Sequence, residues 1–230
     1  MKYLFFLFVA DFFFLSSFSQ SVASANAFPM NAYDISGKPL TNNGPAMEGS
    51  PMLNSNWGKG LVKFKNGNWV RDVELQFNLR ENELYFRKNY QSLAFVDTVL
   101  EFILAYEEEK VPHSVLYRSG YPFKGKNKNF QFFEVVQDGP FLQLLKLTTK
   151  VVVEKNSYGR GKEKEFRESF DWYVFDVKKT EITRVKKDKS SLKQALPDYA
   201  ERIEVLTKEN GYKLRSEEEI AELINLLNRQ

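Results

Sequence analysis

The chain contains one histidine, His113, and histidine is the side chain best suited to acid–base chemistry near neutral pH. A Ser-His-Asp arrangement would have to use it, with Ser114 or Ser119 as the nucleophile. The local sequence does not specify the tertiary contacts that such a site needs. We therefore expect His113 to be a loop histidine beside Pro112 rather than a catalytic base.

A second candidate nucleophile lies near the end of the chain. Ser190-Ser191-Leu192-Lys193 has the S-x-x-K spacing of serine acylating enzymes. The companion motifs Lys-Thr-Gly and Ser-Asp-Asn do not occur in the sequence. A serine that caps a helix N-terminus explains the same residues, so we expect no catalytic residue in this segment.

Carboxylates and metal ligands indicate no clearer site. The runs Glu107–Glu109 and Glu217–Glu219 are typical of solvated surface, and a glycosidase needs two carboxylates at a separation that the sequence does not fix. Because the chain has no cysteine and one histidine, zinc sites built from several such ligands are excluded. EF-hand, P-loop and G-x-G-x-x-G spacings are missing too, so we expect no metal and no cofactor.

Two surface features bear on binding partners. The stretch Lys178–Lys193 carries seven basic and two acidic residues but no aromatic residue. This argues against nucleic acid and favours a solvated strand-to-helix junction, with attraction to an anionic envelope component as the alternative. Aromatic residues could form a sugar-stacking platform on an open sheet, although they more often fill the core of a β protein. The candidates for ligand stacking are Trp57, Trp69, Trp172 and Tyr173, with Tyr85 and Phe86 as further aromatic residues.

The first 27 residues have the pattern of a cleavable export signal. Lys2 provides positive charge, an apolar run of 13 residues covers Tyr3–Leu15 with Asp11 as its one interruption, and small residues follow. The run is shorter than the roughly 18 to 20 residues that cross a bilayer, and no cysteine is present to carry a lipid. We expect a periplasmic, outer-membrane-associated or extracellular protein with no transmembrane anchor after cleavage.

The rest of the chain divides into three segments. A Pro/Gly/Asn-rich lead-in over 28–56 is expected to be flexible, an antiparallel β body covers 57–187, and a helical segment covers 188–230. Within the body, Asn66-Gly67 joins two alternating runs, which predicts a hairpin whose two turn residues both have positive φ. The alternation places four residues on one face: Trp69, Val73, Leu75 and Phe77.

Two segments of the body are less clear. Asp97–Tyr106 fits helical and strand spacing equally well, and its β-branched and aromatic content favours a strand. Asn156–Lys164, with two glycines amid charged residues, is expected to be a loop between long strands.

The last segment changes to helical periodicity. Ser190–Leu196 predicts a short helix, Asp198 is expected to cap a second that ends near Asn210-Gly211, and Ser216 begins a third with a capping box. The third helix has an apolar stripe that we expect to dock on the β body: Ile220, Leu223, Ile224 and Leu227.

Turn and strand motifs spread over residues 49 to 230 are similar to those of a known group. They are Gly49-Ser50-Pro51, Gly60-Leu61-Val62, Asn66-Gly67, Val73-Glu74-Leu75-Gln76-Phe77-Asn78, Phe132-Phe133-Glu134-Val135-Val136-Gln137-Asp138-Gly139, Trp172-Tyr173-Val174-Phe175, Ser191-Leu192-Lys193-Gln194-Ala195-Leu196-Pro197-Asp198 and Lys208-Glu209-Asn210. With these motifs the chain resembles a group of uncharacterised exported bacterial β-rich proteins of unknown function. The resemblance implies a shared fold and export, and it implies no activity.

The sequence therefore predicts a mainly β protein of the α+β kind. It has an antiparallel, hairpin-rich sheet or barrel-like body, followed by two to three short C-terminal helices. The expected function is a non-catalytic binding or scaffolding role in the cell envelope, with an envelope protein or a glycan as partner and no nucleic acid. A binding module for a carbohydrate or another small ligand is the alternative, and a hydrolase is the second alternative.

Cleavage of the export signal is open to a direct test. We expect the exported protein to begin at Gln20 or at Phe28, because cleavage after Ser19 or after Ala27 follows the small-residue pattern. N-terminal sequencing of exported protein checks this. Recovery of an intact Met1 in that material would refute cleavage.

Overall fold

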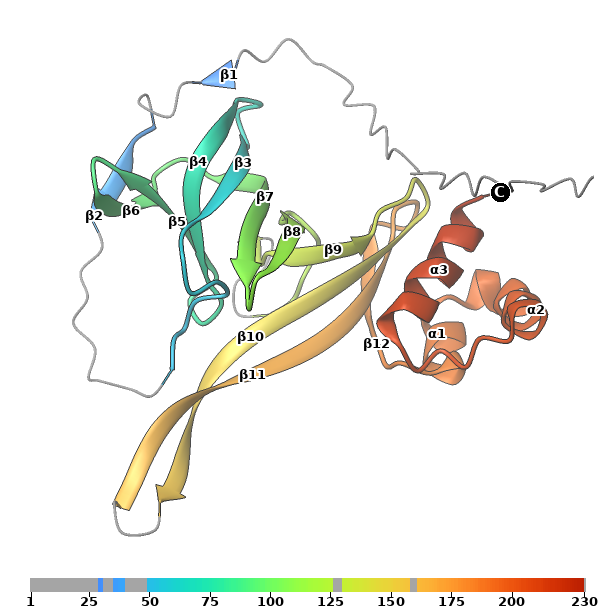
Figure 1. The fold of residues 1–230 in the computed structure, drawn as a ribbon. Helices are drawn as coiled ribbons and strands as arrows, with labels where there is room; N and C mark the ends of the chain where they lie inside the picture. The colour runs from blue at the N-terminus through green and yellow to red at the C-terminus, as the bar shows by residue number, and fades with distance from the viewer. Residues whose placement is uncertain (1–28, 31–34, 40–48, 126–129, 158–160, 230) are drawn as a thin grey trace, which may run out of the picture.

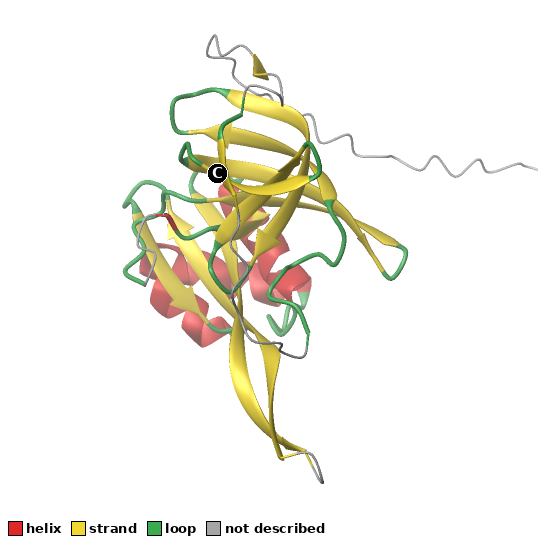
Figure 2. Cartoon of the chain, turned by 90° about the vertical axis from the view of Figure 1, so that its left-hand side faces the viewer, coloured by secondary structure: helices red, strands yellow, loops and turns green. Residues whose placement is uncertain are grey.

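The computed structural model describes residues 29–30, 35–39, 49–125, 130–157 and 161–229. The described chain is mostly β, and three short helices follow the last strand (Figures 1 and 2). This confirms the predicted fold class of a hairpin-rich antiparallel sheet with a C-terminal helical segment. The predicted export signal lies outside the described residues.

Eleven strands lie side by side in the order β12-β11-β10-β9-β8-β7-β3-β4-β5-β6-β2, and β1 pairs in parallel with β4. Among the described strands, β12 and β2 form the two ends and do not pair with each other, so the sheet is open rather than a closed barrel. The strands are β1 Pro29–Met30, β2 Gly37–Pro39, β3 Gly58–Phe64, β4 Trp69–Asn78, β5 Glu83–Lys88, β6 Gln91–Phe95, β7 Val99–Glu108, β8 Val111–Arg118, β9 Phe133–Gln137, β10 Leu142–Ser157, β11 Gly161–Asp176 and β12 Glu181–Val185.

The described part of the lead-in pairs with the sheet. β2 pairs with β6, and Leu53 N donates to Phe77 O at 2.8 Å while Leu79 N donates to Pro51 O at 3.0 Å. These contacts use backbone groups, which every residue carries. A segment without apolar periodicity therefore joins the sheet with no signal in its side chains.

The Asn66-Gly67 hairpin between β3 and β4 is confirmed, but its turn type differs from the prediction. Gly67 N donates to Phe64 O at 3.0 Å, and Gly67 has φ 87°. Asn66 is not among the residues with positive φ. The connection is a type I turn followed by one left-handed residue, which is the common three-residue hairpin loop.

A β-bulge in β4 changes which side chains face the core. The partners of β3 jump from Val73 to Val70, so Arg71 and Asp72 together oppose one residue, and Asp72 has φ 56°. A bulge shifts side-chain alternation by one. Val70 is therefore fully buried, whereas Trp69, which was predicted on this face, is half-buried beside the Arg71 guanidinium.

Two hairpins have turns made of residues other than glycine. Asn89 and Tyr90 join β5 to β6, and Glu109 and Lys110 join β7 to β8, all four with positive φ. Two consecutive left-handed residues are the mark of a type I′ turn, whose twist matches that of the strands. The second turn closes β7, which confirms the strand favoured for Asp97–Tyr106.

β10 and β11 form the longest hairpin. They pair without interruption from Leu142 opposite Asp176 to Ser157 opposite Gly161. Both views show the far part of this ribbon projecting from the body (Figures 1 and 2). The loop predicted between two long strands has bounds that are too wide at Asn156–Lys164, because strand pairing extends to Ser157 and resumes at Gly161, while 158–160 lie outside the described residues. On a two-stranded ribbon, charged residues can occupy strand positions because little surface is buried.

The helices are α1 Lys189–Ala195, α2 Ala200–Asn210 and α3 Glu217–Asn228, with a 3₁₀ turn at Pro197–Tyr199. No helix among the described residues is long and apolar enough to span a bilayer.

Two of the predicted helix signals are confirmed and two are wrong. Ser216 accepts from Glu219 N at 3.2 Å at the start of α3, and Gly211 ends α2 with φ 68°. Asp188, not a serine, caps α1 by accepting from Ser191 N at 2.8 Å. Asp198 lies in the 3₁₀ turn and pairs with a lysine instead of capping α2.

Three apolar clusters hold these elements together. One fills the curved part of the sheet from β3 to β8, and the loop after β8 packs a second onto one face of β9 to β12. The helices cover the opposite face, where they pack on Leu142, Leu144 and Val174. The predicted stripe of α3 is fully buried there, which confirms the expected docking: Ile220, Leu223, Ile224 and Leu227.

The contribution of α3 to stability can be measured with one substitution. We expect Leu223→Ala to lower the free energy of unfolding by about 2–5 kcal/mol, because it leaves a cavity under a fully buried side chain. Urea unfolding followed by circular dichroism measures the change. Glu222→Ala, at an exposed position of the same helix, should stay within about 0.5 kcal/mol of the unmodified chain. Equal stability of both variants would contradict the docking.

Candidate functional site

A row of paired residues crosses one face of the sheet from β8 to β11. Tyr117 pairs with Glu134, Glu134 with Lys146, and Lys146 with Trp172. Residues that face each other across strands project to the same side of a sheet. The row thus places a glutamate and a lysine between two aromatic side chains, on the same face as the helices and next to them.

Lys146 lies between two carboxylates. Its Nζ is 3.4 Å from Glu134 Oε2 and 3.3 Å from Glu217 Oε2. Trp172 Nε1 donates to Glu217 Oε2 at 2.8 Å. Glu217 belongs to the first turn of α3, where the helix dipole favours negative charge. The docked helix therefore supplies the second acidic partner of a strand lysine.

Glu134 has an altered proton affinity. Burial raises its pKa, the charge of Lys146 opposes that shift, and the charge of Glu217 adds to it, with a raised pKa as the result. The side chains of Glu134 and Lys146 are 20% and 19% exposed, so their interaction is only partly screened by water. Glu134 is thus the carboxylate at this site whose protonated form the fold favours.

The tip of the β7–β8 hairpin carries an aromatic stack. The rings of Tyr106 and His113 are 5.1 Å apart between centroids and 18° from parallel, and the two residues are direct partners across the strands. Burial, followed by the charges of Glu108 and Glu134, raises the pKa of Tyr106 to about 12, so its hydroxyl stays a donor at neutral pH. The loop position predicted for His113 is wrong, because the type I′ turn extends β8 back to Val111.

These groups line one cavity of about 530 Å³, which we call the trough. Lys150 lies at the end away from Lys146, where its Nζ is 3.6 Å from Glu168 Oε1 and donates to Met52 O at 2.6 Å. Thr148 and Phe170, a pair across β10 and β11, lie between the two lysines. The trough thus combines ring faces with two lysine–glutamate pairs. Its principal side chains are Tyr106, His113, Glu134, Lys146, Lys150 and Phe170.

The serines that a Ser-His-Asp site would have needed do not share this site with His113. Ser114 follows His113 directly on β8 and so projects to the other face. The Ser119 hydroxyl is buried and donates to Val99 O or Leu100 O, at 3.2 and 3.1 Å. In the S-x-x-K segment, Lys193 Nζ pairs with Glu204 at 3.0 Å on the helix surface. Ser119 and Lys193 therefore have structural contacts instead.

The four aromatic residues predicted to stack on a ligand are not brought into one row. Trp57 and Trp69 lie at opposite ends of the β3–β4 hairpin, because Trp69 pairs with Lys63, which is six residues or about 20 Å along the strand from Trp57. Trp172 and Tyr173 are consecutive on β11 and point to opposite faces. Trp172 borders the trough through Glu217, and Tyr173 packs on Phe133 with centroids 5.4 Å apart.

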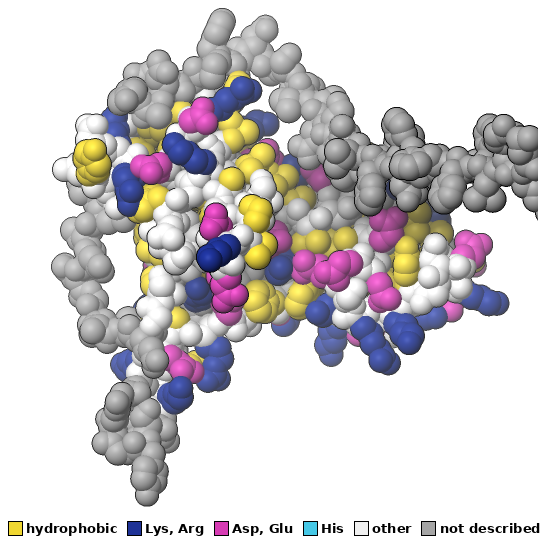
Figure 3. Space-filling view, in the orientation of Figure 1, with side chains coloured by type: hydrophobic (Ala, Val, Ile, Leu, Met, Phe, Trp, Pro, Cys, Tyr) yellow, Lys and Arg dark blue, Asp and Glu magenta, His cyan; other side chains and the backbone are white. Residues whose placement is uncertain are grey.

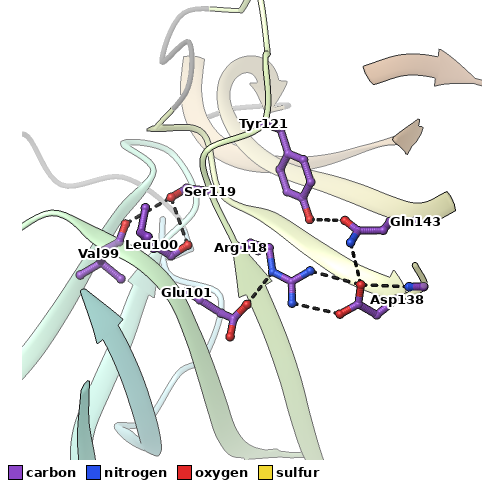
Figure 4. Close-up of polar contacts among 9 residues, drawn as sticks. Val99, Leu100, Glu101, Arg118, Ser119, Tyr121, Asp138 and Gln143 are labelled. Atoms are coloured by element: carbon purple, nitrogen blue, oxygen red, sulfur yellow. Dashed lines mark hydrogen bonds and ion pairs between the residues drawn. The ribbon is translucent and has the colours of Figure 1, made fainter. Parts of the chain in front are cut away.

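A second polar cluster lies on the other face of β7 and β8 (Figure 4). Arg118 donates to Glu101 Oε2 at 2.5 Å and to both oxygens of Asp138 at 3.2 and 3.0 Å. Burial opposes the charge of Arg118, but the hydrogen bond with Asp138 and the charge of Glu101 outweigh it and raise the arginine pKa. Asp138 also accepts from Gln143, whose Oε1 accepts from Tyr121. The cluster is internally satisfied, so we assign it a structural role.

Two further surface features are weaker candidates. A hollow of about 400 Å³ lies beside Asn82 and Phe130, but the Asn82 amide group is already bonded to Phe130 O and Phe132 N. The basic stretch Lys178–Lys193 surrounds the β12–α1 junction, and Figure 3 shows lysine and arginine side chains along the lower edge of the helices. Several of these lysines pair with carboxylates of the helical segment, as Lys189 does with Glu204 at 2.7 Å.

No family model, no curated protein and no solved structure matches this chain. The trough is therefore assigned from its geometry. Sequence reasoning missed it because its residues come from five strands whose register sets them together. The one available signal was alternation in β10 and β11, which places Lys146, Thr148 and Lys150 on one face.

The raised pKa of Glu134 predicts a pH-dependent stability. The folded state holds this proton more tightly than the unfolded chain, so the contribution of Glu134 is complete below the ordinary value of 4.5 and is lost as pH rises through the folded pKa. The stability of the unmodified chain relative to Glu134→Gln should therefore fall as pH rises from about 4 to 7. Urea unfolding across that range measures it.

Glu204→Gln is the control of opposite sign. Hydrogen bonds from Lys189 and Lys193 lower the pKa of Glu204, so this carboxylate stabilises the fold above its ordinary pKa and loses that effect as pH falls. The stability difference between the unmodified chain and Glu134→Gln could instead stay constant or rise with pH. That outcome would show that the charge of Lys146 outweighs the effect of burial on the pKa of Glu134.

Proposed function

We propose that this chain is an exported, non-catalytic binding protein whose trough holds a neutral polyhydroxylated ligand, with carbohydrate as the best-fitting class. The observation that carries the proposal is the presence of ring faces and lysine–glutamate pairs in one cavity of about 530 Å³. Sites of this size bind through apolar and aromatic walls and a few placed polar groups. Carboxylates and ammonium groups can exchange hydrogen bonds with hydroxyls, and the rings can stack on the apolar face of a sugar.

The charge of the trough favours a neutral ligand over an anionic one. Two lysines, Lys146 and Lys150, stand among three glutamates of the trough, Glu108, Glu134 and Glu168, and Glu217 adds a fourth carboxylate at its edge. A strongly anionic molecule would meet excess negative charge. The export signal pattern and the resemblance of residues 49–230 to exported proteins support an envelope location.

A hydrolase is the second candidate, and one observation favours it. His113, Glu134 and Glu168 line the same cavity, and the raised pKa of Glu134 suits a general acid. Against it, each of the two carboxylates is paired with a lysine of β10.

Calorimetric titration of the full chain with a panel of neutral oligosaccharides tests the proposal. We expect Phe170→Ala and Tyr106→Ala each to weaken binding about tenfold, or about 1.4 kcal/mol, because each removes a ring face from the trough. Phe141→Ala, an exposed aromatic position outside the trough, is the matched control and should bind unchanged. Failure of all the sugars to bind would contradict the proposal. Release of shortened sugars that stops in Glu134→Gln would establish the hydrolase instead.

A further inference from the structure

The outer edge of β10 is unpaired over most of its length among the described residues. β9 pairs with β10 only at Leu144–Lys146, and from Leu147 to Ser157 the strand pairs with β11 alone. The far part of the ribbon, toward Ser157, projects from the body in both views (Figures 1 and 2). Such an edge presents a row of backbone donors and acceptors to any strand that can lie beside it.

The two edges of the ribbon differ in chemistry. Natural sheets protect exposed edges with charged side chains. On β11, four of the five residues Lys164–Glu168 are charged, and Glu165 is already paired with Arg167 at 3.0 Å. The five β10 residues that face them, Lys150–Glu154, contain three consecutive valines, of which Val151 is 48% exposed. The β11 edge is protected in this way, and the β10 edge is not.

We propose that a second copy of this chain occupies the β10 edge, so that two β10 strands pair antiparallel about a two-fold axis at Val152. The free edge from Leu147 to Ser157 has Val152 as its midpoint. Pairing about that residue uses the whole free edge of each copy and stops where β9 begins. The two hairpins become one four-stranded antiparallel sheet.

Charge complementarity selects the same register. With Val152 at the centre, Lys150, whose Nζ is also 3.6 Å from Glu168 Oε1 of its own chain, faces the partner's Glu154, and Val151 faces the partner's Val153. A centre moved by one residue in either direction sets Lys150 or Glu154 opposite a valine. Opposite charges across a strand pair stabilise it, whereas a charge facing an apolar residue does not.

The proposed contact closes on itself. A two-fold interface uses the same edge of both copies, so no free β10 edge remains for a third. The charged β11 edge discourages growth from the other side. Because paired residues project to the same side, the two troughs would open on one face of the joined sheet.

Disulfide trapping tests the register. The chain has no cysteine, so Val152→Cys introduces one thiol per copy. Residues paired at a two-fold axis have Cα atoms about 4.5 or 5.5 Å apart, within the range of a disulfide. Mild oxidation of the full chain should link Val152→Cys into a dimer. Phe166→Cys, whose position faces Val152 on the protected strand, should stay unlinked. No link at Val152→Cys, or equal linking of both variants, would overturn the proposal.

Sedimentation equilibrium of the unmodified full chain provides an independent readout. At about 100 µM we expect a dimer, and the double variant Val151→Lys/Val153→Lys should raise the dissociation constant at least about tenfold because it sets lysine opposite lysine. An unchanged circular dichroism spectrum shows that the variant is folded. A monomer for the unmodified chain, a species larger than a dimer, or an unweakened double variant would overturn the proposal.

Discussion

The unbroken pairing of β10 with β11 is the constraint on which the other features of the molecule depend. Sixteen consecutive residue pairs hold the two strands in one register, so each strand presents the same alternation from end to end. On one face, Leu142 and Leu144 carry the helices, and Lys146 and Lys150 line the trough. A shift of one residue would exchange the faces and remove helix docking and trough together.

The trough also depends on a sharp change of direction in the sheet. β8 and β9 share only two residue pairs, so the β3–β8 part can turn relative to the long hairpin. Arg118 fixes the turn, since it binds Glu101 on β7 and Asp138 after β9 at once. The tip of the β7–β8 hairpin then lies over the ribbon, where Tyr106 and His113 face residues that are distant in sequence.

Local patterns predicted most of the strands and the third helix, and the tertiary arrangement explains what they did not predict. Asn66-Gly67 and the α3 stripe act within a few residues, so the sequence shows them directly. The bulge at Asp72 and the turn at Glu109-Lys110 place ordinary side chains at positive φ, for which composition gives no signal. Because the sequence does not reveal that turn, His113 was expected in a loop. Because it does not reveal the register between β8, β9 and β10, the residues of the trough could not be recognised as neighbours.

The docking of α3 and the chemistry of the trough are coupled through one helix. At its C-terminal end Asn228 accepts from Leu142 N and donates to Leu142 O, both at 2.9 Å, which ties the helix to the start of β10. At its N-terminal end Glu217 contacts Lys146 and Trp172. Lys146 is largely buried and so has lost much of its hydration. Removing one partner of such an ion cluster is destabilising, because the remaining charge is then poorly compensated. Undocking α3 would therefore leave Lys146 with Glu134 alone, and the helix sets the electrostatics of a cavity that its apolar stripe does not line.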